Sequence, residues 1–328
     1  MYYKKIGSTD INASVVALGT WSMGGDSNWG PAEDENSIRV IHTAIDMGIN
    51  YFDTAPAYGF GHSEQVLKKA LEGHRDKVYV ATKCGLRCDE TDETTYLHNQ
   101  RDGITNRRNL SPASMRFELE RSLQNLGTDY VDMYITHYQT MPGYEPSIEV
   151  TMTALESFRK EGLIRGIGAS NITREQILEY TKYGTLDLVQ NKYSMLDRDT
   201  QKEIVALCAE KKMAFQTFSP MERGILAGKI GLDTEISNRA RQNNKWYERE
   251  NRVKVLGMLD KMKPLCGKYS CDISSIVVAW TLAQNGSINL LCGSRKIEQI
   301  QANALGGGFV MDKEDIAAID GYLSEVLA

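Results

Sequence analysis

Four residues with reactive or charged side chains follow strand-like runs in close succession. Asp53 ends one run, Tyr58 follows it after a turn, Lys83 ends the next run, and His137 follows the one after that. A phenol has a reference pKa of about 10, so it is a poor acid at neutral pH unless a cation stabilises its phenolate. A lysine held by a carboxylate could supply that cation, and an imidazole could orient a carbonyl group. Together these groups would suit reduction of a carbonyl compound by hydride transfer.

Each of these residues also has an ordinary interpretation. Asp53 could cap a turn, Tyr58 could pack within a loop, Lys83 could end a strand in solvent, and His137 could be a buried imidazole with its hydrogen bonds satisfied. For any one residue alone the ordinary interpretation is favoured. Because all four follow consecutive strand ends, a shared site is the better interpretation of the set.

The elements that must position these residues alternate between short β-branched runs and longer helical patterns. Such alternation, repeated eight times, is typical of a parallel α/β fold, and eight strands indicate a closed barrel. The predicted strands are 15–18, 51–53, 78–82, 133–136, 166–169, 188–190, 215–218 and 290–292. The predicted helices between them are 33–47, 64–71, 115–126, 148–161, 174–183, 200–210, 249–266 and 298–305. Helix starts are marked by Ser111 before Pro112, and by Thr173 with Gln176 three residues later.

The remaining segments complete a (β/α)8 TIM barrel. Runs 3–6 and 11–16 predict a hairpin over the N-terminal mouth, and helices 273–282 and 313–327 have no strand of their own, so they should pack outside. Segments 85–110 and 219–249 are long connections that leave C-terminal strand ends, where barrel active sites form. No linker or repeat divides the chain, so residues 1–328 are expected to form a single domain.

Composition narrows the classes of function. The formal charge of -5 and the pI near 5.7 provide no net positive field, which disfavours nucleic acid as a partner. The amino end lacks the apolar run of a signal sequence, and no stretch is long enough to span a membrane, so a cytoplasmic location is expected. The six cysteines form no CxxC pair and the five histidines form no HxxxH or HExxH spacing. Reduced thiols and the absence of a metal site are therefore expected.

The chain also resembles the aldo-keto reductase superfamily over nearly its whole length, in the manner of a bacterial-type member near the potassium-channel β-subunit branch. The matching segments are GTWSMGG, NYFDTAPAYG, ATK, LGTDYVDMYITH, GASN, FSPMERGILAGK and GSRKIEQIQAN. The resemblance implies a catalytic tetrad in which Tyr58 is the general acid, Lys83 and Asp53 tune it, and His137 orients the substrate. The expected activity is reduction of small aldehydes or ketones to alcohols with NADPH.

No GxGxxG motif follows a first strand, so a Rossmann domain is disfavoured. The resemblance instead implies a dinucleotide that lies extended across the top of the barrel. The implied cofactor-binding residues are Gly19, Thr20, Trp21, Ser170, Asn171, Gln190, Phe218, Ser219, Pro220, Met221, Gly224, Leu226, Lys229, Gly293, Ser294, Arg295, Lys296, Gln299 and Asn303. Hydroxyl and cationic groups at a helix start suit an anion. An ordinary capped helix with surface charges would explain these residues equally well. The family resemblance implies that Arg295 and Lys296 contact a 2′-phosphate and favour NADPH over NADH. Ala302 stands where many members carry glutamate, so the adenine contacts should differ.

Aromatic residues near the tetrad are candidates for the substrate pocket. Trp21, Trp29 and Tyr138 offer flat apolar faces that suit aldehydes and ketones broadly. Tyr138 departs from the tryptophan found after this histidine in many members, which bears on specificity. Arginines in the two long connections could attract an anionic substrate, although solvated surface positions are the favoured interpretation.

Two other functions remain open. An intact tetrad is compatible with a dinucleotide-binding regulatory module of slow turnover, and Lys83 could act as the Schiff-base nucleophile of an aldolase on the same barrel. The physiological carbonyl compound, the favoured direction and the oligomeric state do not follow from the sequence.

Overall fold

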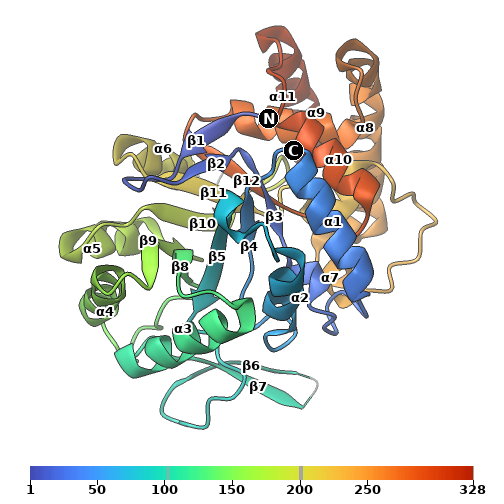
Figure 1. Cartoon of the computed structure of the whole chain (residues 1–328). Helices are drawn as coiled ribbons and strands as arrows, with labels where there is room; N and C mark the ends of the chain where they lie inside the picture. Colours follow the sequence, from blue (N-terminus) through green and yellow to red (C-terminus); the bar gives the residue numbers. More distant parts are fainter. Residues whose placement is uncertain (102, 199–201, 328) are drawn as a thin grey trace.

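The computed structural model describes residues 1–101, 103–198 and 202–327. Eight parallel strands close into a barrel in which the spatial order follows the chain order (Figure 1). The strands are β3 (Val16–Gly19), β4 (Tyr51–Asp53), β5 (Tyr79–Cys84), β8 (Val131–Thr136), β9 (Ile164–Ser170), β10 (Leu188–Lys192), β11 (Ala214–Phe218) and β12 (Ile288–Gly293). The predicted (β/α)8 architecture is confirmed.

Helices surround the barrel and begin at the capping residues that the sequence indicates. Ser111 accepts a hydrogen bond from the amide of Ser114 before α3, and Thr173 with Gln176 forms a capping box before α5. The surrounding helices are α1 (Asp34–Asp46), α2 (His62–Ala70), α3 (Pro112–Leu126), α4 (Ile148–Lys160), α5 (Arg174–Tyr183), α6 (Lys202–Glu210), α9 (Ile273–Ala283) and α10 (Ile297–Gly306). The predicted start of the sixth helix, at residue 200, lies outside the described residues.

Two long helices, α8 (Arg249–Tyr269) and α11 (Lys313–Leu327), lie outside the barrel and pack on each other (Figure 1). The sequence interpretation was wrong on this point, because it placed helix 273–282 outside and 249–266 in the shell. Eight consecutive residues of α9, from 274 to 281, are buried, since it lies between β12 and α8. A helix that is buried all round belongs between two layers, whereas the charge-rich α8 can face solvent. No helix of the described ranges is both long and apolar enough to cross a membrane.

The N-terminal hairpin closes one mouth of the barrel. Strands β1 (Tyr3–Lys5) and β2 (Asn12–Ser14) pair antiparallel. Ile6 and Ile11 from the hairpin join Tyr51, Met133 and Leu188 of the barrel interior in one buried apolar cluster. The C-terminal ends of the strands are left for the site.

Both long connections contain secondary structure that the sequence did not predict. The first holds an antiparallel hairpin, β6 (Tyr96–Arg101) and β7 (Ile104–Arg108), which lies below α3 in Figure 1. The second holds η4 (Glu222–Ala227), α7 (Arg239–Gln242) and η5 (Lys245–Tyr247). The hairpin residues are mainly polar and half-buried, so they lack the alternation of apolar and polar side chains by which strands are recognised.

Two carboxyl groups on the surrounding helices hold the end of β5. Thr82 donates its hydroxyl to Glu64 Oε1 at 2.7 Å, and the Gly85 amide donates to Glu118 Oε2 at 2.7 Å. Burial raises the pKa of Glu118 to about 8. Lys83 lies between these two anchors, so its backbone is fixed from outside the barrel.

The raised pKa of Glu118 predicts a pH-dependent stability. The folded state binds this proton more tightly than the unfolded chain does, so the stabilisation is present below pH 4.5 and is lost as the pH rises towards 8. Glu118→Gln keeps an acceptor for Gly85 and removes the titration. When the pH rises from about 6 to about 9, the free energy of unfolding of the wild type should fall. The corresponding fall in Glu118→Gln should be smaller by at least about 1 kcal/mol. Urea unfolding at both pH values measures this difference. Glu120→Gln, on the exposed face of the same helix, should follow the wild type, and parallel curves for Glu118→Gln would contradict the interpretation.

Candidate active site

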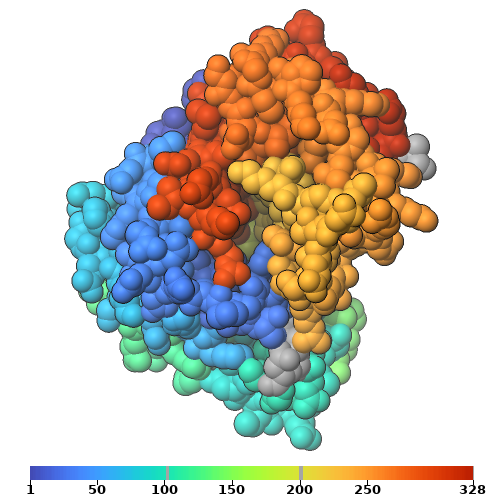
Figure 2. Space-filling model, turned by 90° about the vertical axis from the view of Figure 1, so that its right-hand side faces the viewer, coloured from blue at the N-terminus to red at the C-terminus, as the bar shows by residue number. Residues whose placement is uncertain are grey.

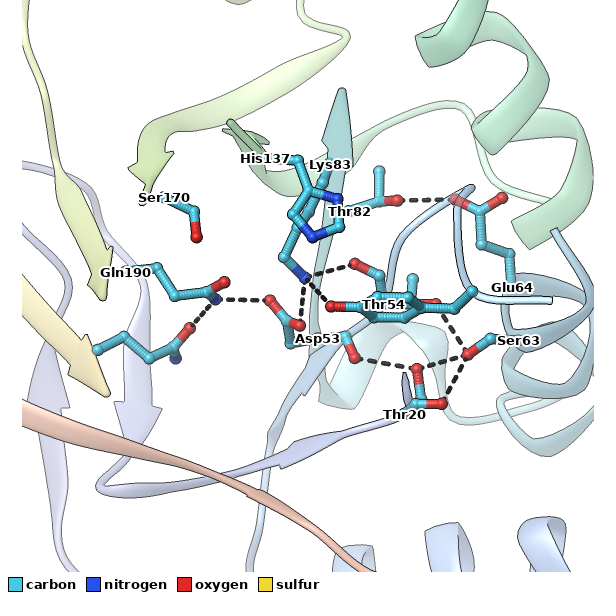
Figure 3. Close-up of polar contacts among 12 residues, drawn as sticks. Thr20, Asp53, Thr54, Ser63, Glu64, Thr82, Lys83, His137, Ser170 and Gln190 are labelled. Carbon is cyan, nitrogen blue, oxygen red and sulfur yellow. Dashed lines mark hydrogen bonds and ion pairs between the residues drawn. The ribbon is translucent and has the colours of Figure 1, made fainter. Parts of the chain in front are cut away.

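A buried ion pair lies at the centre of the site. Lys83 Nζ is 2.5 Å from Asp53 Oδ1, and both side chains are 1% exposed. The ammonium also donates to the backbone oxygen of Thr54 at 2.9 Å and to the hydroxyl of Tyr58 at 3.2 Å (Figure 3). A lysine ammonium has three donors, so each one has a partner.

Tyr58 is held over this ion pair by a tight turn after β4. The Lys83 ammonium lies 4.9 Å from the centre of the Tyr58 ring as well as against its hydroxyl. Gly59 follows with φ of +61°, and a Cβ at this position would lie 2.0 Å from the backbone oxygen of Gly24. Only glycine fits there, so the direction of the Tyr58 turn is set by backbone contact with the loop after β3.

His137 follows β8 and faces Tyr58. Its amide donates to the backbone oxygen of Cys84 at 2.8 Å, and its own backbone oxygen accepts from Asn171 Nδ2 at 2.8 Å. The His137 ring meets that of Tyr58 edge-on, with 5.8 Å between their centres, and stacks on Tyr138 at 5.2 Å. The structure therefore brings together all four residues of the predicted tetrad.

Burial is the largest influence on the pKa values of the site. Burial, followed by the charge of Asp53, raises the pKa of Tyr58 well above 10. Desolvation and the nearby carboxylate therefore outweigh any acidifying effect of Lys83 on the pKa of this phenol. Burial also lowers the pKa of Lys83, although Asp53 opposes this. Burial and then Lys83 lower the pKa of His137 well below 6.5, so its imidazole is neutral.

A chain of amides below the ion pair was missed by sequence reasoning. Gln190 Nε2 donates to Asp53 Oδ2 at 2.8 Å and to Gln216 Oε1 at 2.7 Å. Gln216 in turn donates to Asn289 at 3.0 Å. Gln190, expected on the nicotinamide carboxamide, thus uses both amide protons within the protein, as Figure 3 shows. Polar residues within the otherwise apolar runs of β11 and β12 were the available signal.

Residues expected near the nicotinamide surround the tetrad, although Thr20 does not face it. Gly19, Ser170 and Phe218 end β3, β9 and β11. The hydroxyl of Thr20 donates to the backbone oxygen of Asp53 at 3.0 Å and accepts from Ser63 at 2.6 Å. Thr20 is 1% exposed, and its hydrogen bonds fasten the loop after β3 to the end of β4 and to the start of α2.

The segment after β11 is strained and folds inward. Ser219 and Arg223 adopt left-handed φ values of 56° and 57°, which cost energy in residues with a Cβ. Leu226, expected against the pyrophosphate, is fully buried in the cluster that contains Trp280. Its side chain belongs to the core because η4 packs against α9. Lys229 is exposed at the far end of this segment.

The segment after β12 is held by hydrogen bonds to the first loop. Arg295 donates from Nη1 to the backbone oxygen of Trp29 at 2.8 Å and from Nη2 to that of Pro31. Asn303 donates to the hydroxyl of Ser294 at 3.2 Å. Contrary to expectation, the Arg295 guanidinium is engaged by the first loop, whereas Lys296 is exposed. Figure 2 shows the hollow bounded by this red-orange segment, the blue first loop and the yellow segment after β11.

The aromatic residues expected to line the substrate pocket lie beside Tyr58 and His137. Trp21 is 6.3 Å from Tyr58 and 5.5 Å from Trp29, between ring centres. Tyr138 continues the wall beyond His137. The rings therefore form a continuous aromatic surface from the first loop to the loop after β8.

Comparison with known proteins decides the family. The profile of the Aldo/keto reductase family matches residues 15–324, which is nearly the whole chain. The chain belongs to the aldo-keto reductase family. Family members are oxidoreductases of carbonyl compounds that bind a nicotinamide cofactor, and this coarse description applies here.

Individual aldo-keto reductases resemble the chain over most of its length. It is similar to the NADH-specific methylglyoxal reductase of Escherichia coli (strain K12), with 41% identity over 300 residues covering 91% of each chain. It is 31% identical to an aldo-keto reductase of Bacillus subtilis (strain 168), covering 100% of this chain and 95% of that one. Among solved structures, a glycerol dehydrogenase from Gluconobacter oxydans superposes with a TM-score of 0.87 at 30% identity, covering 99% and 96% of the two chains.

The buried ion pair of this aldo-keto reductase predicts a coupled effect on stability. Lys83→Met leaves the Asp53 carboxylate buried without its cation, which should cost about 3–5 kcal/mol of unfolding free energy. The double variant Asp53→Asn with Lys83→Met removes both charges and keeps an acceptor for Gln190, so it should be more stable than Lys83→Met alone. Urea unfolding of the wild type, both single variants and the double variant measures the coupling. A double variant no more stable than Lys83→Met would contradict this account.

Proposed function

We propose that this aldo-keto reductase reduces small aldehydes or ketones to alcohols, with Tyr58 as the proton donor. The observation that carries the proposal is the position of the Tyr58 hydroxyl, 3.2 Å from a Lys83 ammonium that Asp53 holds at 2.5 Å. A bound reduced nicotinamide supplies the hydride. The protein residues then have to orient the carbonyl group and deliver one proton to its oxygen.

The raised pKa of Tyr58 suits this role in the direction of reduction. A phenol whose pKa lies above the ambient pH is fully protonated before the reaction. As the carbonyl oxygen gains negative charge it becomes more basic than the phenol, and the proton moves from Tyr58 to that oxygen. The Lys83 ammonium stabilises the resulting phenolate through the hydrogen bond already present.

His137 is proposed to orient the substrate as a neutral donor. Its pKa is far below neutrality, so the imidazole carries one N–H, which can donate to the carbonyl oxygen without a net charge. The edge-on contact with Tyr58 directs both groups towards one space. Trp21, Trp29 and Tyr138 are proposed to form the walls that exclude water from it.

The aldolase alternative is disfavoured by the bonding of Lys83. A Schiff-base nucleophile needs a free amine lone pair, whereas this ammonium donates to three acceptors and one of them is a carboxylate. A regulatory module of slow turnover is distinguished by kinetics, since it would bind dinucleotide but show negligible multiple turnover on a panel of aldehydes.

Tyr58→Phe tests the proton donor. The variant keeps the aromatic ring and loses the hydroxyl, so kcat for aldehyde reduction should fall by about 10²- to 10⁴-fold while dinucleotide binding persists. Stopped-flow absorbance for turnover and fluorescence titration for binding measure the two effects. Tyr183→Phe, an exposed position on α5, is the matched control. Turnover at the wild-type rate in Tyr58→Phe would show that Tyr58 is not the proton donor.

The dinucleotide is proposed to lie in the hollow of Figure 2. The donor set around this hollow fits an anionic ligand, because the start of α10 has no side-chain cap and Lys296 is exposed beside it. Gly19, Trp21 and Phe218 would flank the nicotinamide, with Ser170 and Asn171 beside its carboxamide. The proposed phosphate contacts come from the segments after β11 and β12, namely Ser219, Pro220, Met221, Gly224, Lys229, Gly293, Ser294, Arg295, Lys296, Gln299 and Asn303.

NADPH and NADH are both proposed as hydride donors, with only a small preference between them. The family resemblance favours NADPH through a 2′-phosphate contact from Arg295 and Lys296. Arg295, however, donates to the backbone oxygens of Trp29 and Pro31, and these hydrogen bonds must break before it can bind a phosphate. The 41% identical relative is named as NADH-specific, which also supports NADH.

Titration of the purified protein with each dinucleotide measures this balance. The dissociation constants of NADPH and NADH should lie within about tenfold of each other. The contact that Arg295 would gain with the 2′-phosphate is largely offset by the loss of its two hydrogen bonds to the first loop. Lys296→Gln should weaken NADPH binding and leave NADH binding unchanged. A hundredfold preference for NADPH in the wild type would show that Arg295 leaves the first loop for the phosphate.

A further inference from the structure

Arg108 in β7 lies against the aromatic wall beside the tetrad. The carbon Cζ of its guanidinium is 4.6 Å from the centre of the Tyr138 ring and 5.1 Å from that of Tyr96. The Tyr138 ring stacks on His137, and His137 meets Tyr58. Two rings therefore separate Arg108 from the proposed proton donor, and its charge contributes to the lowered pKa of His137.

The charge of Arg108 has no carboxylate partner within the described parts of the chain. Its Nε donates to His98 Nδ1 at 3.1 Å, and its Nη1 donates to the backbone oxygen of Gln139 at 3.0 Å and to Met141 Sδ at 3.3 Å. None of these three acceptors is a carboxylate, and Nη2 donates to no described residue. The guanidinium is thus oriented by the protein but is not neutralised by it.

Three other half-buried arginines of this chain pair with buried carboxylates. Arg75 and Arg165 both pair with the buried carboxylate of Asp132, and Arg159 pairs with that of Asp187. Burial without such a partner is unfavourable, and it lowers the pKa of Arg108 although the group stays charged. A ligand that brings the missing negative charge would relieve this cost.

A carboxylate stands on the opposite wall of the same space. Asp26 accepts from Trp21 Nε1 at 3.3 Å and from Asn28 Nδ2 at 2.8 Å, and it contributes to the raised pKa of Tyr58. The walls on either side of Tyr58 therefore carry opposite charges. A substrate with an anionic end would be turned towards Arg108 and away from Asp26.

We propose that Arg108 binds an anionic group of the carbonyl substrate, either a carboxylate or a phosphoryl group, and so sets a preference for charged over neutral carbonyl compounds. The planar guanidinium suits the oxygens of both groups. The proposal rests on the reductase function proposed above, and it assigns a substrate class to the same site.

Matched pairs of aldehydes test the preference. Succinic semialdehyde is compared with butanal for the carboxylate, and glyceraldehyde 3-phosphate with glyceraldehyde for the phosphoryl group, by kcat/KM at low ionic strength. The wild type should prefer the charged member of at least one pair. Arg108→Gln should lower kcat/KM for that member by about ten- to a hundredfold, the usual loss for a charge-assisted hydrogen bond, and leave the neutral member nearly unchanged. Arg108→Lys should retain part of the preference.

Arg107→Gln is the control, because Arg107 lies next to Arg108 and donates to the backbone oxygens of Glu93 and Thr95 instead. It should keep the wild-type preference. The proposal is overturned if the wild type prefers neither charged aldehyde, if Arg107→Gln has the same effect, or if Arg108→Gln slows charged and neutral aldehydes equally, which is the result expected of a purely structural clamp on Gln139. Should Arg108→Gln fail to fold, the wild-type preference and Arg108→Lys decide. Absence of any aldehyde turnover would instead reject the reductase function.

Discussion

The ion pair between Asp53 and Lys83 is the interaction on which the rest of the site depends. A buried charge is tolerated only when it is paired and hydrogen-bonded on every side, and the barrel meets that condition from several strands. Gln190 satisfies the second oxygen of Asp53, while Thr54 and Tyr58 take the remaining protons of Lys83. The Tyr58 hydroxyl therefore lies where it can accept a hydrogen bond that the buried Lys83 ammonium would otherwise lack.

The loops around this ion pair are joined to one another by hydrogen bonds within the protein. Thr20 connects the loop after β3 to the end of β4 and to the start of α2. Arg295 connects the segment after β12 to the first loop. The segment after β11 is connected to the same loop, because the Ala240 amide donates to the Asn28 backbone oxygen. Because loops carry function while the scaffold positions them, these cross-connections give the rim a defined shape.

Sequence reasoning predicted the barrel, and it predicted that the four residues of the proposed tetrad lie together, because both features leave local signals. Asp53, Lys83 and His137 are strand-end residues, and strand ends are visible as changes in hydrophobic pattern. The partner of Arg295 was not predictable, because it is a backbone oxygen more than 250 residues away that carries no mark in the sequence. Likewise, the direction of the Tyr58 pKa depends on desolvation, which only the packed structure reveals.

The contact between Gly59 and Gly24 constrains how this sequence can vary. A Cβ at Gly59 would lie 2.0 Å from the Gly24 backbone, and one at Gly24 would lie 2.8 Å from the Gly59 amide. Neither position can accept a side chain while the other stays as it is, so an exchange at either one would displace the turn that carries Tyr58. In a lineage free to drift elsewhere, Gly24 and Gly59 would be inherited as a unit together with the Tyr58 hydroxyl.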